Sequence, residues 1–332
     1  MIVRYALAAL VYSSLMYSSL RAQQPEAPIT ALGGISVPGS IDNMPASLAT
    51  NPNFAEFAKQ FRYQNGPDLV EIRVFQANYP NVGIWHNAHK EQSLKLLGSI
   101  SKTSFGNKVE IVAHSNRPNG LVETFELGPP FASTSIATIG FNRWVVVIHS
   151  TSKTLKPADQ SARVDRIIKA INISTPITKH YALNAPLPCS SDEIADFESE
   201  GTAPLPDRPL IAGLIEGLQL AIAKADATGN TAGGGLSMNP DQFCEANSAT
   251  GITRWYQAKK AMGLPRWIQL ISSTGMAVEG FAIMDEGKPL VGGIITHDYK
   301  SSRLTNFHAG FPNPISGQLE GLAVIAQEIQ KP

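Results

Sequence analysis

Hydrophobic, β-branched and aromatic residues gather in several short segments bounded by polar turn residues, which is the pattern of β-strands. In the first half of the chain these segments are residues 69–76, 109–114, 121–127, 133–139 and 143–150. In the second half they are residues 266–272, 276–284, 290–297 and 304–309. Turn residues such as Asn119-Gly120 join neighbouring segments, so we expect antiparallel hairpins.

A separate pattern predicts the helices. Hydrophobic residues recur at helical spacing over residues 85–101, 157–171, 207–225 and 315–329, and in the last of these Ile315, Leu319, Leu322, Ala326 and Ile329 form one apolar stripe. Each half ends as a meander of strands followed by one amphipathic helix. We therefore expect an α+β fold class of two antiparallel β-meander-plus-helix units, with each sheet covered by helices. The two halves could have arisen by internal duplication, or they could have reached the same arrangement of strands and helix independently.

Proline- and glycine-rich breaks divide the chain into five parts. Residues 23–52 read as an extended leader, and residues 174–206 combine repeated prolines with a run of acids, as expected of a linker. The expected organisation is a signal peptide (1–22), the leader (23–52), a first α+β domain (53–173), an acidic Pro-rich linker (174–206) and a second α+β domain (207–332).

The first 22 residues have the layout of a secretory signal peptide. Arg4 supplies one positive charge, residues 5–20 are mostly apolar, and Ala22 offers a small residue at the cut, although Leu20 is bulky for its position. The apolar run is shorter than the roughly 20 residues of a spanning helix. We expect export to the periplasm or the extracellular space, with no integral membrane segment after signal removal.

Cys189 and Cys244 are the only cysteines in the chain. In an exported protein such a pair indicates one disulfide. Two thiols without a C-x-x-C motif do not make a closed zinc site, so no metal site is expected from them.

Composition narrows the classes of function. The chain is 43% hydrophobic with a formal net charge of zero, which argues for a packed core and against nucleic acid as a partner. Neither a G-x-x-x-x-G-K-[ST] phosphate loop nor a G-x-S-x-G nucleophile elbow occurs. No cofactor is predicted.

The catalytic candidates are His297, Asp298 and His308, at the ends of two neighbouring strands, and no sequence motif marks them. A carboxylate beside a histidine is what general-base chemistry uses. If Gly292 pairs with His308, in the register that pairs His297 with Arg303, the two imidazoles point to opposite faces of the sheet, whereas a slip of one residue would bring them together.

Two further motifs carry weaker chemistry. His86 and His89 lie three residues apart at a helix start, a spacing that fits a metal, but the alternative of a solvated helix face is favoured. Gly233-Gly234-Gly235 precedes Ser237 and could line an oxyanion hole, although a flexible connection is the favoured reading.

No convergent catalytic set is visible, so whether the chain is an enzyme stays open. The leading hypothesis is a non-enzymatic exported protein that binds a small ligand or an envelope protein between its two halves. One alternative is a secreted hydrolase with His297 or His308 as general base. Another is a structural partner that pairs through a sheet edge.

Overall fold

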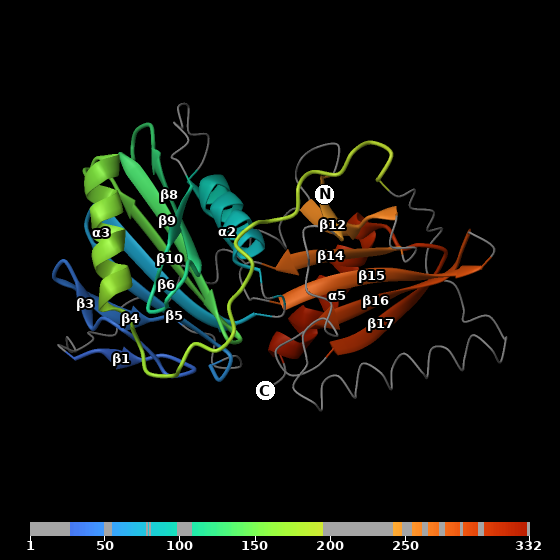
Figure 1. The fold of residues 1–332 in the computed structure, drawn as a ribbon, viewed down its shortest axis with the longest axis horizontal. Helices are drawn as coiled ribbons and strands as arrows, with labels where there is room; N and C mark the ends of the chain where they lie inside the picture. The colour runs from blue at the N-terminus through green and yellow to red at the C-terminus, as the bar shows by residue number, and fades with distance from the viewer. Residues whose placement is uncertain are drawn as a thin grey trace.

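The computed structural model describes residues 27–49, 55–77, 79, 81–97, 108–194, 242–247, 254–260, 265–271, 276–285, 288–297 and 302–330. Within these ranges the chain is mostly β, with 17 strands and three helices arranged as antiparallel sheets of three, eight and six strands (Figure 1). The expected α+β class, with two meanders each covered by helices, is therefore wrong. Strands that the periodicity did not reveal join the predicted ones into much larger sheets.

The eight-stranded sheet holds the five predicted strands of the first half and three more. Its order is β3 (Ser40–Ile41), β4 (Met44–Leu48), β5 (Ala58–Asn65), β6 (Asp68–Gln76), β10 (Trp144–Ser152), β9 (Ser133–Phe141), β8 (Gly120–Glu126) and β7 (Val109–Ile111). All neighbours are antiparallel. The unpredicted strands β3, β4 and β5 extend the sheet beyond β6. The hairpin expected between residues 139 and 143 is observed, with Phe141 paired to Trp144 at its turn.

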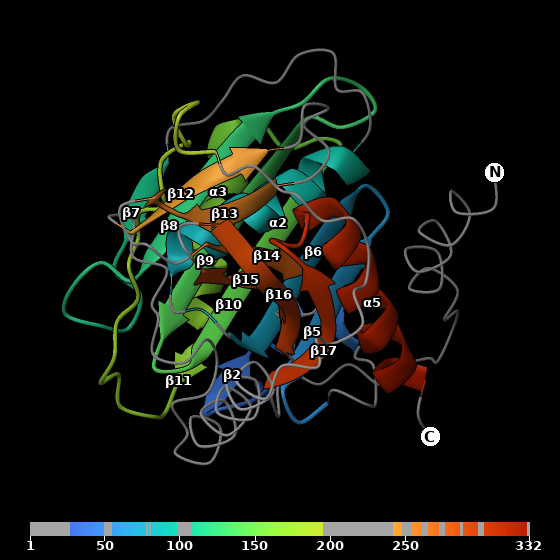
Figure 2. The ribbon, with the colours of Figure 1, turned by 90° about the vertical axis from the view of Figure 1, so that its right-hand side faces the viewer.

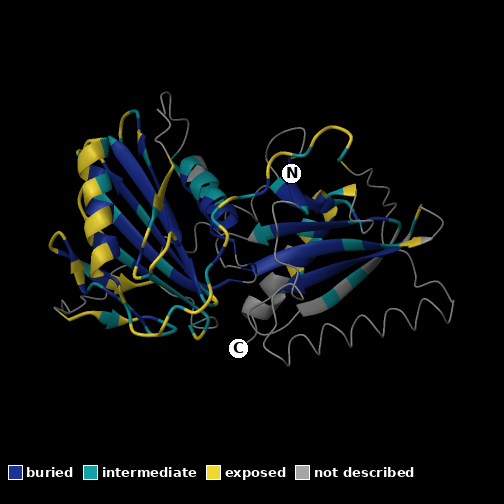
Figure 3. Cartoon of the chain, viewed as in Figure 1, coloured by how far each residue is buried: buried dark blue, intermediate teal, exposed yellow. Residues whose placement is uncertain are grey.

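One face of this sheet carries the main apolar core. Helix α3 (Pro157–Ala170) packs on β8, β9 and β10, burying Val164, Ile167 and Ile168. Figure 3 shows the outer side of this helix exposed. The rest of the face is covered by the three-stranded sheet of β1 (Ile29–Thr30), β2 (Ile35–Val37) and β11 (Asn172–Ile173). Residues 29–48, expected as an extended leader, thus supply four short strands and part of the core.

The opposite face of the same sheet meets helix α2 (Val82–Leu96), which also packs on β8, β9 and β10. Trp85 packs there with Phe75, Val145 and Leu121. The sheet therefore has a helix on each face, which is a second departure from one helix per meander.

The six-stranded sheet runs in chain order: β12 (Phe243–Asn247), β13 (Arg254–Ala258), β14 (Arg266–Ile271), β15 (Met276–Asp285), β16 (Lys288–His297) and β17 (Ser302–Ala309). The last four match the predicted strands. β12 and β13 were not predicted, because β13 is buried along nearly its whole length and a strand buried on both faces loses its alternation.

Helix α5 (Pro314–Gln330) lies along one face of this sheet (Figure 2). Two residues of the expected apolar stripe do not face the sheet, since Ile315 is 46% and Leu319 51% exposed. Gly317 and Gly321 face the sheet instead: a Cβ atom would lie 2.7 Å from Ile294 Cδ1 at Gly317 and 2.5 Å from Val278 Cγ2 at Gly321. Glycine at these two positions lets the helix approach the strands closely.

Cys189 and Cys244 form the predicted disulfide. The disulfide ties the segment around Cys189 to β12 of the six-stranded sheet. Next to it, Pro188 forms a bridge with Glu245 of β12. The described part of the expected linker first runs beside the other sheet, where His180 bridges to Phe141 and Ala182 to Asn81. The helix expected over residues 207–225 lies outside the described residues.

Among the described residues, no helix is long and apolar enough to cross a membrane.

Candidate functional site

His297 belongs to a buried charged cluster on the face of the six-stranded sheet that meets α2. Its Nε2 donates to Glu279 Oε2 at 2.9 Å, and Arg266 binds the same carboxylate through Nε and through Nη2, the latter at 2.8 Å. The three residues come from the adjacent strands β14, β15 and β16. Burial alone would raise the pKa of the Glu279 carboxyl, but Arg266 and His297 lower that pKa to about 2. Glu279 is therefore an anion at neutral pH.

Tyr79 covers this cluster from the other half of the chain. Its ring meets the His297 ring edge to face, with centroids 6.0 Å apart. Burial raises the pKa of the Tyr79 hydroxyl well above its ordinary value, so the hydroxyl stays protonated. The buried Tyr79 hydroxyl lies beside Arg266 and Glu279, and both residues act on its pKa.

His308 lies on the opposite face of the same sheet. It pairs with Gly292, as the opposite-face register required, whereas His297 pairs with Ser302 rather than Arg303, because a register shift falls between Ile294 and Ile295. His308 Nε2 donates to Glu320 Oε2 of α5 at 3.1 Å. The two candidate histidines therefore share no site, and Asp298 lies outside the described residues. Each histidine has instead a glutamate partner that sequence proximity did not reveal.

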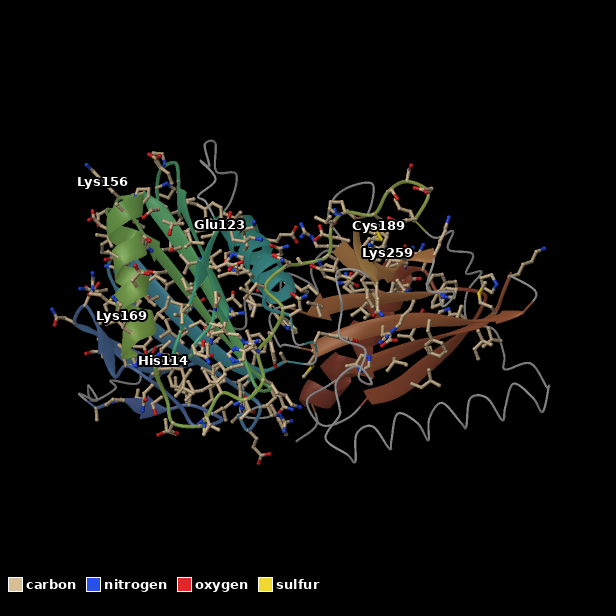
Figure 4. All side chains as sticks on the ribbon, viewed as in Figure 1. His114, Glu123, Lys156, Lys169, Cys189 and Lys259 are labelled. Atoms are coloured by element: carbon tan, nitrogen blue, oxygen red, sulfur yellow. A yellow bond between two sulfur atoms is a disulfide. The ribbon has the colours of Figure 1, made fainter. Side chains whose placement is uncertain are left out.

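A second polar cluster lies beneath α2, on the eight-stranded sheet. His86 Nε2 donates to Glu123 Oε2 of β8 at 3.4 Å, and its Nδ1 lies 3.2 Å from the Thr138 hydroxyl of β9. Lys90 Nζ donates to the same Glu123 oxygen at 3.1 Å. Figure 4 shows Glu123 beside α2. Burial lowers the pKa of His86 despite Glu123, so the ring is neutral at neutral pH and accepts from Thr138.

His89 and His149 continue this cluster toward β6. His149 of β10 lies 3.1 Å from the hydroxyls of both Thr134 and Thr151. His89 packs on Phe75 with ring centroids 5.7 Å apart. His86 and His89 are both buried, so the expected solvated helix face is wrong. Groups of three or more residues able to hold a metal are absent from the described ranges.

Helix α2 also reaches the second sheet. Arg254 of β13 binds Glu91 of α2 and, at 2.9 Å, Glu245 of β12. Tyr79 and Ile84 pack with Phe243, Tyr256 and Ile268 in one apolar cluster. The α2 junction, as we call the contacts of residues 79–96 with both large sheets, thus joins two buried ionic clusters.

In these clusters the acidic and basic side chains neutralise each other. Each buried charge has an opposite charge in contact, which offsets the cost of removing it from water. The sequence did not reveal Arg266, Glu279 or Glu123 as members of these clusters. The one available signal was a glutamate in an otherwise apolar strand, Met276–Asp285, since a buried carboxylate requires a partner. The Ser237 loop lies outside the described residues.

Comparisons with known proteins do not add a family. No protein-family model and no curated protein sequence matches the chain. Solved structures with a partial likeness include the Ran-binding protein Mog1p of Saccharomyces cerevisiae, at 9% identity and a TM-score of 0.31 over 46% of this chain and 96% of that one. They also include the extracellular domain of PknH from Mycobacterium tuberculosis, at 15% identity and a TM-score of 0.20 over 49% and 91%. At these scores we draw neither fold nor function from them.

Proposed function

We propose that this chain is an exported, non-enzymatic binding protein whose ligand or partner binds at the α2 junction. The observation that carries the proposal is the burial of both candidate bases: His297 is 3% and His308 2% exposed, and each Nε2 is held by a glutamate. A general base must reach the proton that it removes. These imidazoles serve packing and neutralisation instead.

The α2 junction is the favoured binding region because, within the described residues, it joins elements from both halves through few direct ion pairs. Arg254–Glu91 is an ion pair that links α2 to the second sheet. A ligand or partner that contacts both sheets there would add to this modest set of contacts, which is a common arrangement for sites between structural units.

Turnover and binding are tested on the same preparation. The protein is assayed against ester, peptide, phosphoester and glycoside substrates, alongside His297→Gln and His308→Gln. We expect no turnover above background for any of the three. Turnover that falls at least a hundredfold in either variant would establish the hydrolase alternative and overturn the proposal.

Binding is measured as the shift in melting temperature with a library of small metabolites and peptides. A ligand of this site raises the melting temperature of the wild-type protein, and Arg254→Gln reduces that shift because it removes the ion pair to Glu91. Arg143→Gln is the matched control, since Arg143 lies at the tip of the β9–β10 hairpin away from this ion pair. A ligand whose shift is unchanged by Arg254→Gln binds elsewhere.

Export is the remaining part of the proposal. The disulfide between Cys189 and Cys244 is consistent with an oxidising compartment. N-terminal sequencing of the protein recovered from outside the cytoplasm should begin at Gln23. A sequence that begins at Met1 would contradict cleavage.

A further inference from the structure

The α2 junction holds three imidazoles on one face of the eight-stranded sheet, two of them buried (His86 and His89) and one partly exposed (His149). His86 and His89 come from one turn of α2, and His149 comes from β10 beneath it. Positively charged groups lie among them: Arg73 acts on both His89 and His149, and Lys90 acts on His86. Such a cluster tolerates neutral rings and opposes protonated ones.

The three histidines differ in their acidic neighbours. His86 donates to Glu123, and Glu71 lies close enough to His149 to favour its charged form. His89 has no such neighbour: its surroundings of Arg73, His86 and His149, together with complete burial, all lower its pKa. Its Nε2 has no hydrogen-bond partner among the described residues.

We propose that helix α2 is an acid-released clamp between the two large sheets and that His89 is its trigger. At neutral pH the uncharged His89 ring packs on Phe75, and α2 stays docked on the eight-stranded sheet. A proton on His89, which is 3% exposed, would place a second cation near Arg73 in a largely buried space. Undocking α2 lets water solvate that charge. It also separates Glu91 from its position opposite Arg254, so the contact between the sheets loosens.

Other ionisable groups on the surrounding elements set the direction of the response. They are Lys108 before β7, Glu123 on β8, Glu71 and Arg73 on β6, Arg62 on β5, Arg254 and Glu245 on β13 and β12, and Arg266 and Glu279 on β14 and β15. The pKa values of Glu71, Glu123 and Glu279 are lowered in the folded chain, so these carboxylates stay charged through the range in which histidine titrates. Burial instead raises the pKa of Glu245, so histidine protonation precedes that of Glu71, Glu123 and Glu279 as the pH falls.

The sign and window follow from linkage. A histidine with a folded-state pKa below its ordinary value of about 6.5 binds more protons in the open state. The docked state is therefore favoured above about pH 6.5, and below that pH the opening equilibrium rises about tenfold per pH unit for each such histidine. Between pH 7.5 and pH 5, His89 alone gives a rise of about 30-fold.

Hydrogen exchange resolved by mass spectrometry tests this in the intact chain. Protection of α2 (Val82–Leu96) and of α3 (Pro157–Ala170) is measured from pH 7.5 to pH 5 and corrected for the intrinsic exchange rate. We expect opening of α2 to rise at least 30-fold while α3 stays protected. Equal loss of protection in both helices, or no loss in α2, would overturn the proposal without any variant.

Three variants locate the trigger. His89→Gln should reduce the pH response of α2 by about 30-fold, because glutamine does not titrate. His149→Gln is the second variant and should also weaken the response, so the test survives if His89→Gln fails to fold. His114→Asn is the control. This exposed histidine lies in the β7–β8 loop, beside the C-terminal end of α3 (Figure 4), where its ring hydrogen-bonds to the Ile168 carbonyl. Asparagine tolerates the positive φ of 53° at this position. An unchanged response in folded His89→Gln, or a loss in His114→Asn, would remove His89 as the trigger, and if His89→Gln does not fold, an unchanged response in His149→Gln would overturn the role of the cluster. The result does not depend on which ligand the chain binds.

Discussion

Glu279 and His297 lie on the neighbouring strands β15 and β16, with Glu279 Oε2 2.9 Å from His297 Nε2. They are not directly cross-strand partners: Glu279 pairs with Ile295, and His297 with Ala277. Both side chains nevertheless point to the same face, because residues two apart along a strand share a face. Arg266 completes the cluster from β14, so a single carboxylate joins three strands.

Glu279→Gln should therefore be strongly destabilising. Removing the carboxylate leaves the Arg266 guanidinium buried without its partner, and breaking a buried pair from one side costs about 3–5 kcal/mol. Unfolding in urea measures the difference. Glu126→Gln, at an exposed position of β8, is the control and should change stability by less than about 0.5 kcal/mol. Equal effects of the two substitutions would mean that the cluster contributes nothing specific.

The same carboxylate predicts a loss of stability in acid. The pKa of Glu279 is lowered in the folded chain from its ordinary 4.5 to about 2. A lowered carboxyl pKa contributes stability that is present above pH 4.5 and is lost as the pH falls toward 2. The free energy of unfolding of the wild-type protein should fall across that window, and the fall should be shallower in Glu279→Gln. Parallel curves for the two proteins would show that other groups control the acid transition.

Arg163 and Arg166 of α3 offer a matched pair of substitutions. Arg163 is buried and binds Asp42 at 2.8 Å and Asp68 at 2.7 Å, whereas the Arg166 side chain is 63% exposed and binds Asp42 at 3.2 Å. Arg163→Gln should cost about 2 kcal/mol, because it removes both charge-assisted hydrogen bonds of a guanidinium that is itself buried. Arg166→Gln should cost about 1 kcal/mol at most. Denaturant unfolding compares them, and a larger loss in Arg166→Gln would contradict the assignment.

Strands with a continuous run of apolar and β-branched residues between turn residues could be predicted from the sequence. Trp144–Ser152 and Met276–Asp285 are examples. The strands between residues 29 and 48 could not, since each is five residues or shorter and their turns hold Asp42 and Asn43 at positive φ. Their strand state comes from pairing with distant partners such as β5 and β11. Local sequence does not encode that information.

The hairpin of β7 and β8 was predicted correctly, but the Asn119-Gly120 turn signal explains only part of its loop. Asn119 does not adopt the positive φ that its Asn-Gly context suggested, and His114 does. The Asn119 side chain instead accepts from the Ala113 N–H at 2.7 Å and donates to the Ala113 carbonyl at 2.9 Å. A buried amide thus closes the loop from within.

The candidate site was only partly predictable for a related reason. Asp298 was the acid nearest to His297 in sequence, but the observed partners are Glu279 and Glu320, 18 and 12 residues from their histidines. The register shift in β17 that displaces Arg303 from His297 is likewise invisible in the hydrophobic pattern.

Removing the disulfide with Cys189→Ser and Cys244→Ser should lower stability by about 4 kcal/mol, because the bridge closes a loop with a sequence separation of 55 residues. Thermal unfolding with and without reductant measures it. Reductant should destabilise the wild-type protein and leave the double variant unchanged. A wild-type melting temperature that does not respond to reductant, with the bond confirmed as cleaved, would show that the loop is constrained by other contacts.

Gly321→Ala tests whether close approach of α5 to the sheet matters. Alanine is favoured over glycine in a helix by about 1 kcal/mol, but the new Cβ would lie 2.5 Å from Val278 Cγ2. Overpacking of this kind costs about 1–3 kcal/mol, so we expect a net loss of about 1 kcal/mol. Val278→Ala removes the opposing methyl groups and leaves a cavity, which is destabilising alone. In the double variant the two changes should compensate, with a coupling of at least about 1 kcal/mol in a double-mutant cycle. Additive effects would mean that α5 moves away from β15 without cost, and that its packing on this sheet is loose.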